Sequence, residues 1–78
     1  MLNIEHSQNF LKVINKIKDN STKQKIKTQI RKIIDNPEIG KPMMHDRKGT
    51  REVYIKPFRL SYAYLKDEDK IIFLNLYH

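Results

Sequence analysis

The chain has 78 residues, of which 16 are lysine or arginine and 9 are aspartate or glutamate, and its net charge is +7. This length predicts a single domain over residues 1–78 with a small hydrophobic core. The absence of cysteine excludes disulfides, thiolate zinc sites and thiol nucleophiles. No apolar run is long enough for a membrane span, and the first residues lack a signal-peptide pattern, so we expect a soluble cytoplasmic protein.

The first half of the chain predicts two helices within residues 7–36. Apolar residues recur at spacings of three and four, which is typical of amphipathic helices, at Phe10, Leu11, Ile14, Ile17, Ile26, Ile30, Ile33 and Ile34. Ser7 is the expected N-cap of the first helix, and residues 19–22 mark a break, with Ser21 or Thr22 starting the second helix. Pro37 ends that helix. The short connection predicts an antiparallel helical hairpin.

The second half predicts strands. Residues 38–42 contain glycine and proline and are expected to form a loop. From residue 51 onward β-forming residues alternate, at 53–55, 60–65 and 71–77. The short links at 56–58 and 66–70 imply antiparallel neighbours. Residues 1–5 are the candidate for an additional N-terminal strand.

These elements predict an α+β fold, with an N-terminal helical hairpin packed on one face of a twisted antiparallel sheet of three to four strands. Alternation assigns the side chains of each strand to two faces. The helix-covered face would receive Val53, Ile55, Leu60, Tyr62 and Tyr64. The opposite face would receive Tyr54, Lys56, Arg59, Ser61 and Ala63. The small residues beside Arg59 predict room for a ligand over the sheet.

Basic residues gather in two groups, and the net positive charge favours a polyanionic partner. The first group lies on the second predicted helix, where it is either a solvated face or a nucleic-acid contact: Lys23, Lys25, Lys27, Arg31 and Lys32. The second group lies in the loop and the first strands, where the side chains can converge on one site: Lys41, Arg47, Lys48, Arg51, Lys56 and Arg59. Arg59 alternatively pairs with Glu52 at the start of a hairpin.

The histidines and two tyrosines complete the candidate site. His6, His45 and His78 have no metal-ligand spacing, so we expect neither a metal nor another cofactor. His45 either contacts phosphate or is solvated, and His78 is a candidate proton donor at the chain end, although alternation places it on the helix side. Tyr54 and Tyr77 either stack on bases or pack as ordinary strand residues.

Three segments resemble the RelE/ParE superfamily of toxins from type II toxin–antitoxin modules: GKP at 40–42, DRKGTREV at 46–53 and KPFRLSY at 56–62. The resemblance implies a RelE-like fold, a cognate antitoxin that inhibits the toxin, and ribosome-dependent, metal-free cleavage of mRNA. In that chemistry the ribose 2′-hydroxyl attacks the adjacent phosphate and leaves a 2′,3′-cyclic phosphate and a 5′-hydroxyl.

The resemblance also implies roles for individual residues. Arg59, with Lys48 and either Arg51 or Lys56, would stabilise the phosphorane. Tyr77-His78 matches a Tyr-His pair near the C-terminus of YoeB-like toxins, which makes His78 the implied acid. The glutamate that YoeB-like toxins carry after Lys-Pro is Met43 here, so no general base is identified. A RelE-like branch uses lysines instead of an acid–base pair, and Lys48 and Lys56 are the candidates for that role here. The expected RNA-binding residues are Lys56, Tyr54, Tyr77, His45, Arg47, Lys41, Lys23, Lys27 and Arg31.

Two other functions remain open on the same fold. A ParE-like toxin would inhibit DNA gyrase by binding it, without RNA chemistry. A non-catalytic RNA-binding module, or an inactivated toxin, would bind RNA with a steep salt dependence and release no product.

Overall fold

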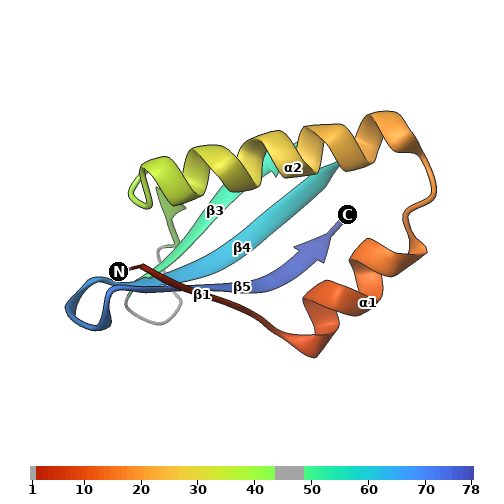
Figure 1. Cartoon of the computed structure of the whole chain (residues 1–78). Helices are drawn as coiled ribbons and strands as arrows, with labels where there is room; N and C mark the ends of the chain where they lie inside the picture. Colours follow the sequence, from red (N-terminus) through yellow and green to blue (C-terminus); the bar gives the residue numbers. More distant parts are fainter. Residues whose placement is uncertain (1, 44–48) are drawn as a thin grey trace.

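The computed structural model describes residues 2–43 and 49–78, and over these residues two helices pack on a five-stranded sheet (Figure 1). The elements follow in the order β1 (Asn3–His6), α1 (Gln8–Lys16), α2 (Asn20–Asp35), β2 (Lys41–Pro42), β3 (Thr50–Ile55), β4 (Phe58–Leu65) and β5 (Lys70–Tyr77). A short 3-10 turn, Lys66–Glu68, links β4 to β5. The predicted α+β class is therefore confirmed.

The sheet has the strand order β1-β5-β4-β3-β2. This corrects the predicted sheet in two respects. The strand β1 confirms the candidate N-terminal strand, but a fifth strand, the two-residue β2, lies where glycine and proline had indicated a loop. The strand β1 also runs parallel to β5, with Ile4 opposite Ile71, whereas the other pairs are antiparallel. Pro42 is tolerated because β2 lies at the edge of the sheet.

Side-chain caps define where the helices begin. The Ser7 hydroxyl accepts a hydrogen bond from the Phe10 backbone N–H, so the predicted cap of α1 is confirmed. The second helix begins before the predicted start, because the Asp19 carboxylate accepts from both the N–H and the hydroxyl of Thr22. No helix among the described residues combines the length and the apolar character that a bilayer span needs.

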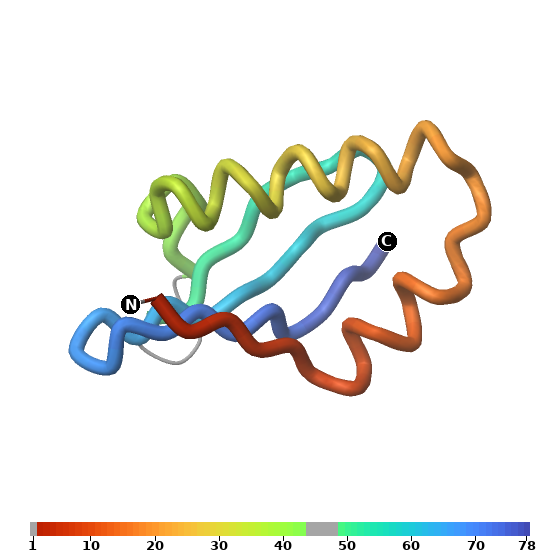
Figure 2. Tube along the Cα trace, viewed as in Figure 1, coloured from red at the N-terminus to blue at the C-terminus, as the bar shows by residue number. Residues whose placement is uncertain are grey.

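The core lies between the helices and one face of the sheet. Its buried side chains come from both helices and from β3, β4 and β5: Phe10, Ile26, Ile33, Ile55, Leu60, Tyr62, Ile71, Phe73 and Leu76. The helices spread over this face, with α1 against β5 and α2 against β3 (Figure 2). Leu11, which the helical spacing placed in the core, is 40% exposed because it lies beside the space between the helices.

A polar contact at the buried Tyr62 fixes the chain between α2 and β2. Its hydroxyl donates to the Pro37 carbonyl at 2.8 Å and accepts from the Gly40 N–H at 2.9 Å. A Cβ atom added at Gly40 would lie only 2.6 Å from that hydroxyl oxygen, so a glycine is needed for this close approach. Burial raises the pKa of the Tyr62 hydroxyl, which stays protonated and able to donate.

Candidate functional site

The sheet face turned away from the helices carries the candidate site, which we call the open face. Strand register brings its residues together, since Tyr54 on β3 lies opposite Arg59 on β4, and Arg59 lies opposite Tyr77 on β5. One step along the sheet, Lys41 lies opposite Glu52 and Glu52 opposite Ser61. The open face is therefore defined by Lys41, Glu52, Tyr54, Arg59, Ser61 and Tyr77.

Glu52 is the centre of the hydrogen bonds on the open face. One carboxylate oxygen accepts from the Arg59 guanidinium at 3.0 Å, and the other accepts from the Tyr77 hydroxyl. The hydrogen bond from Tyr77, followed by the interactions with Arg59, holds the pKa of the Glu52 carboxyl below its usual value, although burial opposes this. The pairing of Arg59 with Glu52 is thus confirmed as one of the two predicted alternatives.

Arg59 remains accessible although it is paired. Its side chain is 55% exposed, and its guanidinium lies 5.5 Å from the centre of the Tyr54 ring, a cation–π contact. Glu52 binds one nitrogen of the Arg59 guanidinium, and the Tyr54 ring covers one of its faces. The rest of the guanidinium is directed to solvent. Such a group can accept a second anion, and its planar set of donors matches the oxygens of a phosphate.

The expected room over the small residues is less than alternation indicated. Ser61 is 7% exposed and Ala63 is 8% exposed. Tyr77 lies on β5 and Glu52 on β3, the two strands that flank β4. The hydrogen bond between their side chains therefore crosses over β4 on the open face. This contact shields Ser61, so the accessible part of the open face lies at Arg59 and Tyr54.

Arg51 lies away from this cluster. It faces Tyr62 across the sheet, and its guanidinium donates to the carbonyls of Glu38 and Gly40 at 2.9 Å and 2.7 Å. These bonds hold the connection that leads into β2. The structure therefore places Arg51, one of the predicted catalytic residues, in a position that stabilises a loop and separates it from Arg59.

His78 also lies apart from Arg59. The centres of its ring and of the Phe58 ring lie 5.9 Å apart in an edge-to-face arrangement, and Phe58 packs against the core. This is the side of the sheet on which Leu76 is buried, as alternation predicted, whereas Tyr77 points to the open face. The pair Tyr77-His78 is thus divided between the two faces.

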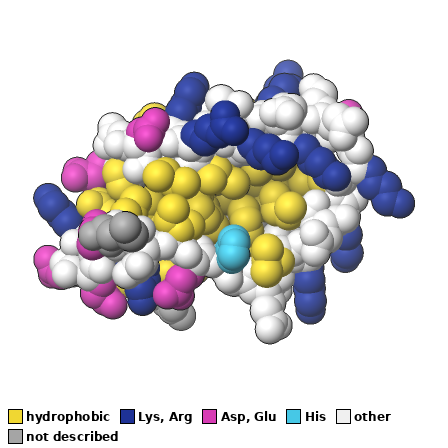
Figure 3. Space-filling view, viewed as in Figure 1, with side chains coloured by type: hydrophobic (Ala, Val, Ile, Leu, Met, Phe, Trp, Pro, Cys, Tyr) yellow, Lys and Arg dark blue, Asp and Glu magenta, His cyan; other side chains and the backbone are white. Residues whose placement is uncertain are grey.

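The remaining predicted residues fall into three places. Lys23 and Lys27 border a groove of about 480 Å³ between α1 and α2, which contains Phe10 and Ile26, and Arg31 is exposed further along α2. Figure 3 shows this groove as an apolar band next to a row of basic side chains. Lys56 is exposed at the end of β3. The candidates His45, Arg47 and Lys48 lie outside the described residues.

Sequence reasoning treated Glu52 only as a possible partner of Arg59 and gave it no role in the site. The structure makes it the acceptor that links Arg59 to Tyr77. To predict this role of Glu52, the pairing register of all three strands would have been needed. The pairing of β4 with β5 shifts between Ser61 and Tyr62. Period-two alternation alone does not fix such an offset.

Known structures share this fold. The isolated E. coli RelE toxin superposes with a TM-score of 0.82 at 11% identity, covering 99% of this chain and 83% of that chain. A chain of the intact E. coli RelBE toxin-antitoxin complex gives 0.82 at 11% identity, with 99% and 95% covered. A chain of the E. coli DinJ-YafQ complex gives 0.77 at 21% identity, with 99% and 92% covered. At these identities the likeness concerns the fold.

The family assignment comes from the sequence of almost the whole chain. A search of curated proteins gave no significant match. The family model described as "ParE toxin of type II toxin-antitoxin system, parDE" matches residues 4–78. That range includes both helices and all the residues of the open face. The chain therefore belongs to the ParE toxin family of type II toxin–antitoxin systems, within the RelE/ParE superfamily.

Proposed function

We propose that this toxin is a cytoplasmic, ribosome-dependent endoribonuclease that cleaves mRNA without a metal or other cofactor. The observation that carries the proposal is the exposed guanidinium of Arg59, held on the open face by Glu52 and Tyr54. The resemblance to RelE-like and YoeB-like toxins supplies the reaction, in which the 2′-hydroxyl attacks phosphorus and the bond to the 5′-oxygen breaks. A fixed cation beside the phosphate stabilises the charge that develops in this step.

The proposed roles follow from the positions of the side chains. Arg59 contacts the non-bridging oxygens of the scissile phosphate, and Lys41 adds positive charge at the same face. Glu52 and Tyr77 orient Arg59. Lys48 is proposed as a further cation on the phosphate. His78 is the proposed acid, a role that requires its ring to move from Phe58, on the other side of the sheet, to the open face.

A cognate antitoxin is the second part of the proposal. The relatives of known structure include a RelBE toxin-antitoxin complex and a DinJ-YafQ complex. This chain carries a groove between α1 and α2 that exposes apolar side chains such as Leu11. Exposed apolar surface of this kind is typical of a protein that binds a partner. The basic residues along its border favour an acidic partner segment.

The test is cleavage of mRNA on programmed ribosomes, with the cut sites mapped by primer extension. We expect Arg59→Ala to reduce cleavage by about 100-fold or more, since loss of one transition-state donor commonly has an effect of this size. Arg59→Lys retains the charge without the planar donors and should recover part of the activity. Lys12→Ala, on the exposed side of α1, is the control. Equal cleavage by wild type and Arg59→Ala would refute the proposal.

Inhibition of DNA gyrase is a second candidate, because the matching family model carries the name ParE. A supercoiling assay separates the two functions. A gyrase inhibitor would block supercoiling and leave ribosome-bound mRNA intact, and Arg59→Ala would then retain its effect. The proposed endonuclease would give the opposite result in both assays.

A further inference from the structure

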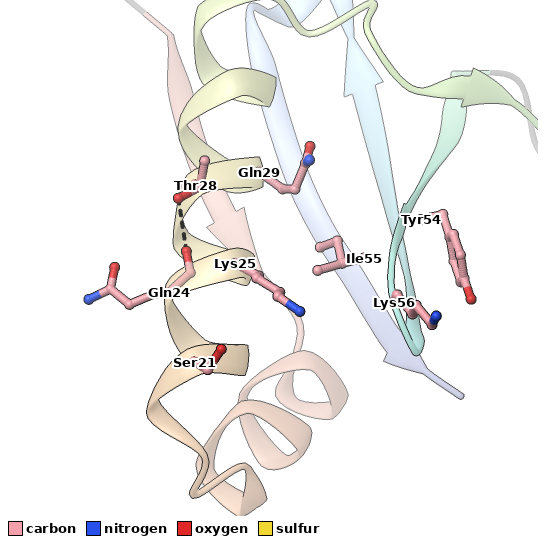
Figure 4. Close-up of a pocket in the computed structure, with 8 residues that line it drawn as sticks. All are labelled: Ser21, Gln24, Lys25, Thr28, Gln29, Tyr54, Ile55 and Lys56. Atoms are coloured by element: carbon pink, nitrogen blue, oxygen red, sulfur yellow. Dashed lines mark hydrogen bonds between the residues drawn. The ribbon is translucent and has the colours of Figure 1, made fainter.

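A second cavity, of about 540 Å³, lies between the first half of α2 and the end of β3 (Figure 4). Its volume is in the usual range for small-ligand sites. Lys25 and Gln29 extend from α2 toward β3, and the buried Ile55 forms its apolar floor (Figure 4). Tyr54 and Lys56 line the side formed by β3. Tyr54 and Lys56 are among the expected RNA-binding residues, and Lys25 belongs to the basic helix group that was expected to be either a solvated face or a nucleic-acid contact.

The charge of this cavity is positive. Lys25 and Lys56 approach it from different elements, and none of the described residues that line it is acidic. Asp19, which interacts electrostatically with Lys25, is already engaged as the N-cap of α2 by two hydrogen bonds from Thr22. The amide of Gln29 and the hydroxyl of Ser21 add neutral hydrogen-bonding groups. This set of groups suits a phosphate with a polar organic group attached.

Tyr54 connects this cavity to the open face. Tyr54 is 61% exposed, it lines the cavity, and the Arg59 guanidinium lies over one face of its ring. No described strand pairs with this edge of β3 beside Tyr54, because β2 pairs only with Arg51 and Glu52 among the described residues. A single strand of RNA can therefore pass from Arg59 around this edge of the sheet without meeting another described β-strand. An exposed tyrosine ring is also a stacking surface for a base.

We propose that this cavity is a nucleotide-binding subsite, in which Lys25 and Lys56 bind a phosphate of single-stranded RNA that flanks the phosphate at Arg59. The ring of Tyr54 stacks on the adjacent base, and Gln29 hydrogen-bonds the sugar or base. The RNA thus contacts the helix side of the β3 edge as well as the open face. This inference rests on the proposed function to the extent that it takes RNA as the substrate.

The test measures binding rather than cleavage. A fluorescent 2′-O-methyl RNA of about ten nucleotides, which lacks the attacking hydroxyl, fits the usual length of a single-strand site. We expect Lys25→Gln to weaken binding by about threefold at low salt, and to reduce the slope of log K against log salt by about 0.7, the value for one lost phosphate contact. The matched control is Lys12→Gln, which removes one helix lysine outside the cavity.

Localisation comes from NMR with the same RNA. The side-chain amide resonances of Gln24 and Gln29 should shift on titration in wild type and shift less in Lys25→Gln. Equal affinity and slope for Lys25→Gln and Lys12→Gln, or no shift at Gln29, would overturn the subsite. So would weakened binding of the antitoxin by Lys25→Gln with unchanged RNA affinity, since the cavity would then be a protein contact.

The two proposals fail separately. If wild type leaves ribosome-bound mRNA intact but Lys25→Gln lowers RNA affinity more than Lys12→Gln, the proposed cleavage is wrong and the subsite stands. If wild type cleaves mRNA and the two lysine variants bind RNA alike, the cleavage stands and the subsite is wrong.

Discussion

On the helix-covered face of the sheet, Leu60, Tyr62 and Phe73 are 0–1% exposed, whereas on the open face Tyr54 is 61% exposed and Arg59 keeps more than half of its side chain in solvent. The same strands supply both faces, since neighbouring residues such as Arg59 and Leu60 point in opposite directions. One face is thus fixed by apolar packing and the other by a few polar contacts around Glu52.

Along a single strand, the residues on the covered face should therefore determine stability, and those on the open face should determine function. A change on the covered face removes buried contacts and leaves a cavity, so it should reduce the free energy of unfolding. A change on the open face removes a solvent-exposed group and should mainly alter binding or chemistry. Four substitutions test this separation.

The largest effect is expected from Phe73→Ala. Phe73 is 1% exposed and lies against the rings of Phe10 and Tyr62. Its truncation should lower the free energy of unfolding by about 3–5 kcal/mol, which threatens folding in a small domain. Urea denaturation followed by circular dichroism measures this. Arg59→Ala, on the other face, should change stability by only about 0.5 kcal/mol; an equal loss in both variants would contradict the separation.

A smaller loss is expected from Tyr62→Phe. Removal of the buried hydroxyl leaves the Gly40 N–H without its acceptor and the Pro37 carbonyl without its donor. An unsatisfied buried group of this kind costs about 1–3 kcal/mol. The matched control is Tyr54→Phe, since Tyr54 is exposed. The prediction fails if the two tyrosine variants have the same denaturation midpoint.

The variant Arg51→Lys tests whether Arg51 stabilises the connection before β2 or takes part in the cleavage of mRNA. Lysine retains the charge but cannot reproduce both contacts to the carbonyls of Glu38 and Gly40. We expect a loss of about 1 kcal/mol in stability and cleavage of mRNA close to that of wild type. Full stability together with greatly reduced cleavage would instead assign Arg51 to the site.

The pH dependence of stability tests the contacts of Glu52 and should be the smallest effect. Because its folded-state pKa is lowered, the carboxylate stabilises the fold above its unfolded pKa of about 4.3, and this contribution is lost as the pH falls through the folded pKa. Glu52→Gln should therefore be less stable than wild type at pH 7, by roughly 0.5 kcal/mol since solvent screens the exposed Arg59.

Denaturation curves at pH 7 and at successively lower pH measure the stability difference between wild type and Glu52→Gln. The difference should shrink toward zero under acid conditions. A difference that stays constant from neutral to acid pH would show that the charge of Glu52 does not stabilise the open face.

The sequence pattern was sufficient for most of the fold because periodicity depends on local geometry. The spacing of Phe10 and Ile14, and of Ile26 and Ile33, predicted both helices, and alternation around Leu60 predicted the hairpin strands; all are confirmed. The direction of β1 was not predictable in this way. Its parallel pairing with β5 joins Ile4 to Ile71, which are far apart in the chain, and no local pattern encodes that choice.

The same distinction between local pattern and long-range contact applies to the candidate site. Alternation correctly placed Tyr54 and Arg59 on the open face and His78 on the other side, because each assignment needs only the pleat of one strand. It did not reveal that Arg51 holds the carbonyls before β2, or that Lys25 and Lys56 approach one cavity. Those facts depend on how a helix and a loop approach the sheet.

By itself, then, the sequence determined the class of fold, the family resemblance and the charge of +7, since composition, periodicity and motif order are properties of the chain. Tertiary structure decided where that charge acts. Glu52 pairs with Arg59 and Tyr77 only because three strands meet in one register, and the cavity beside Tyr54 exists only because α2 lies along the edge of β3. Contacts between distant segments require the packed fold, which local residue patterns do not specify.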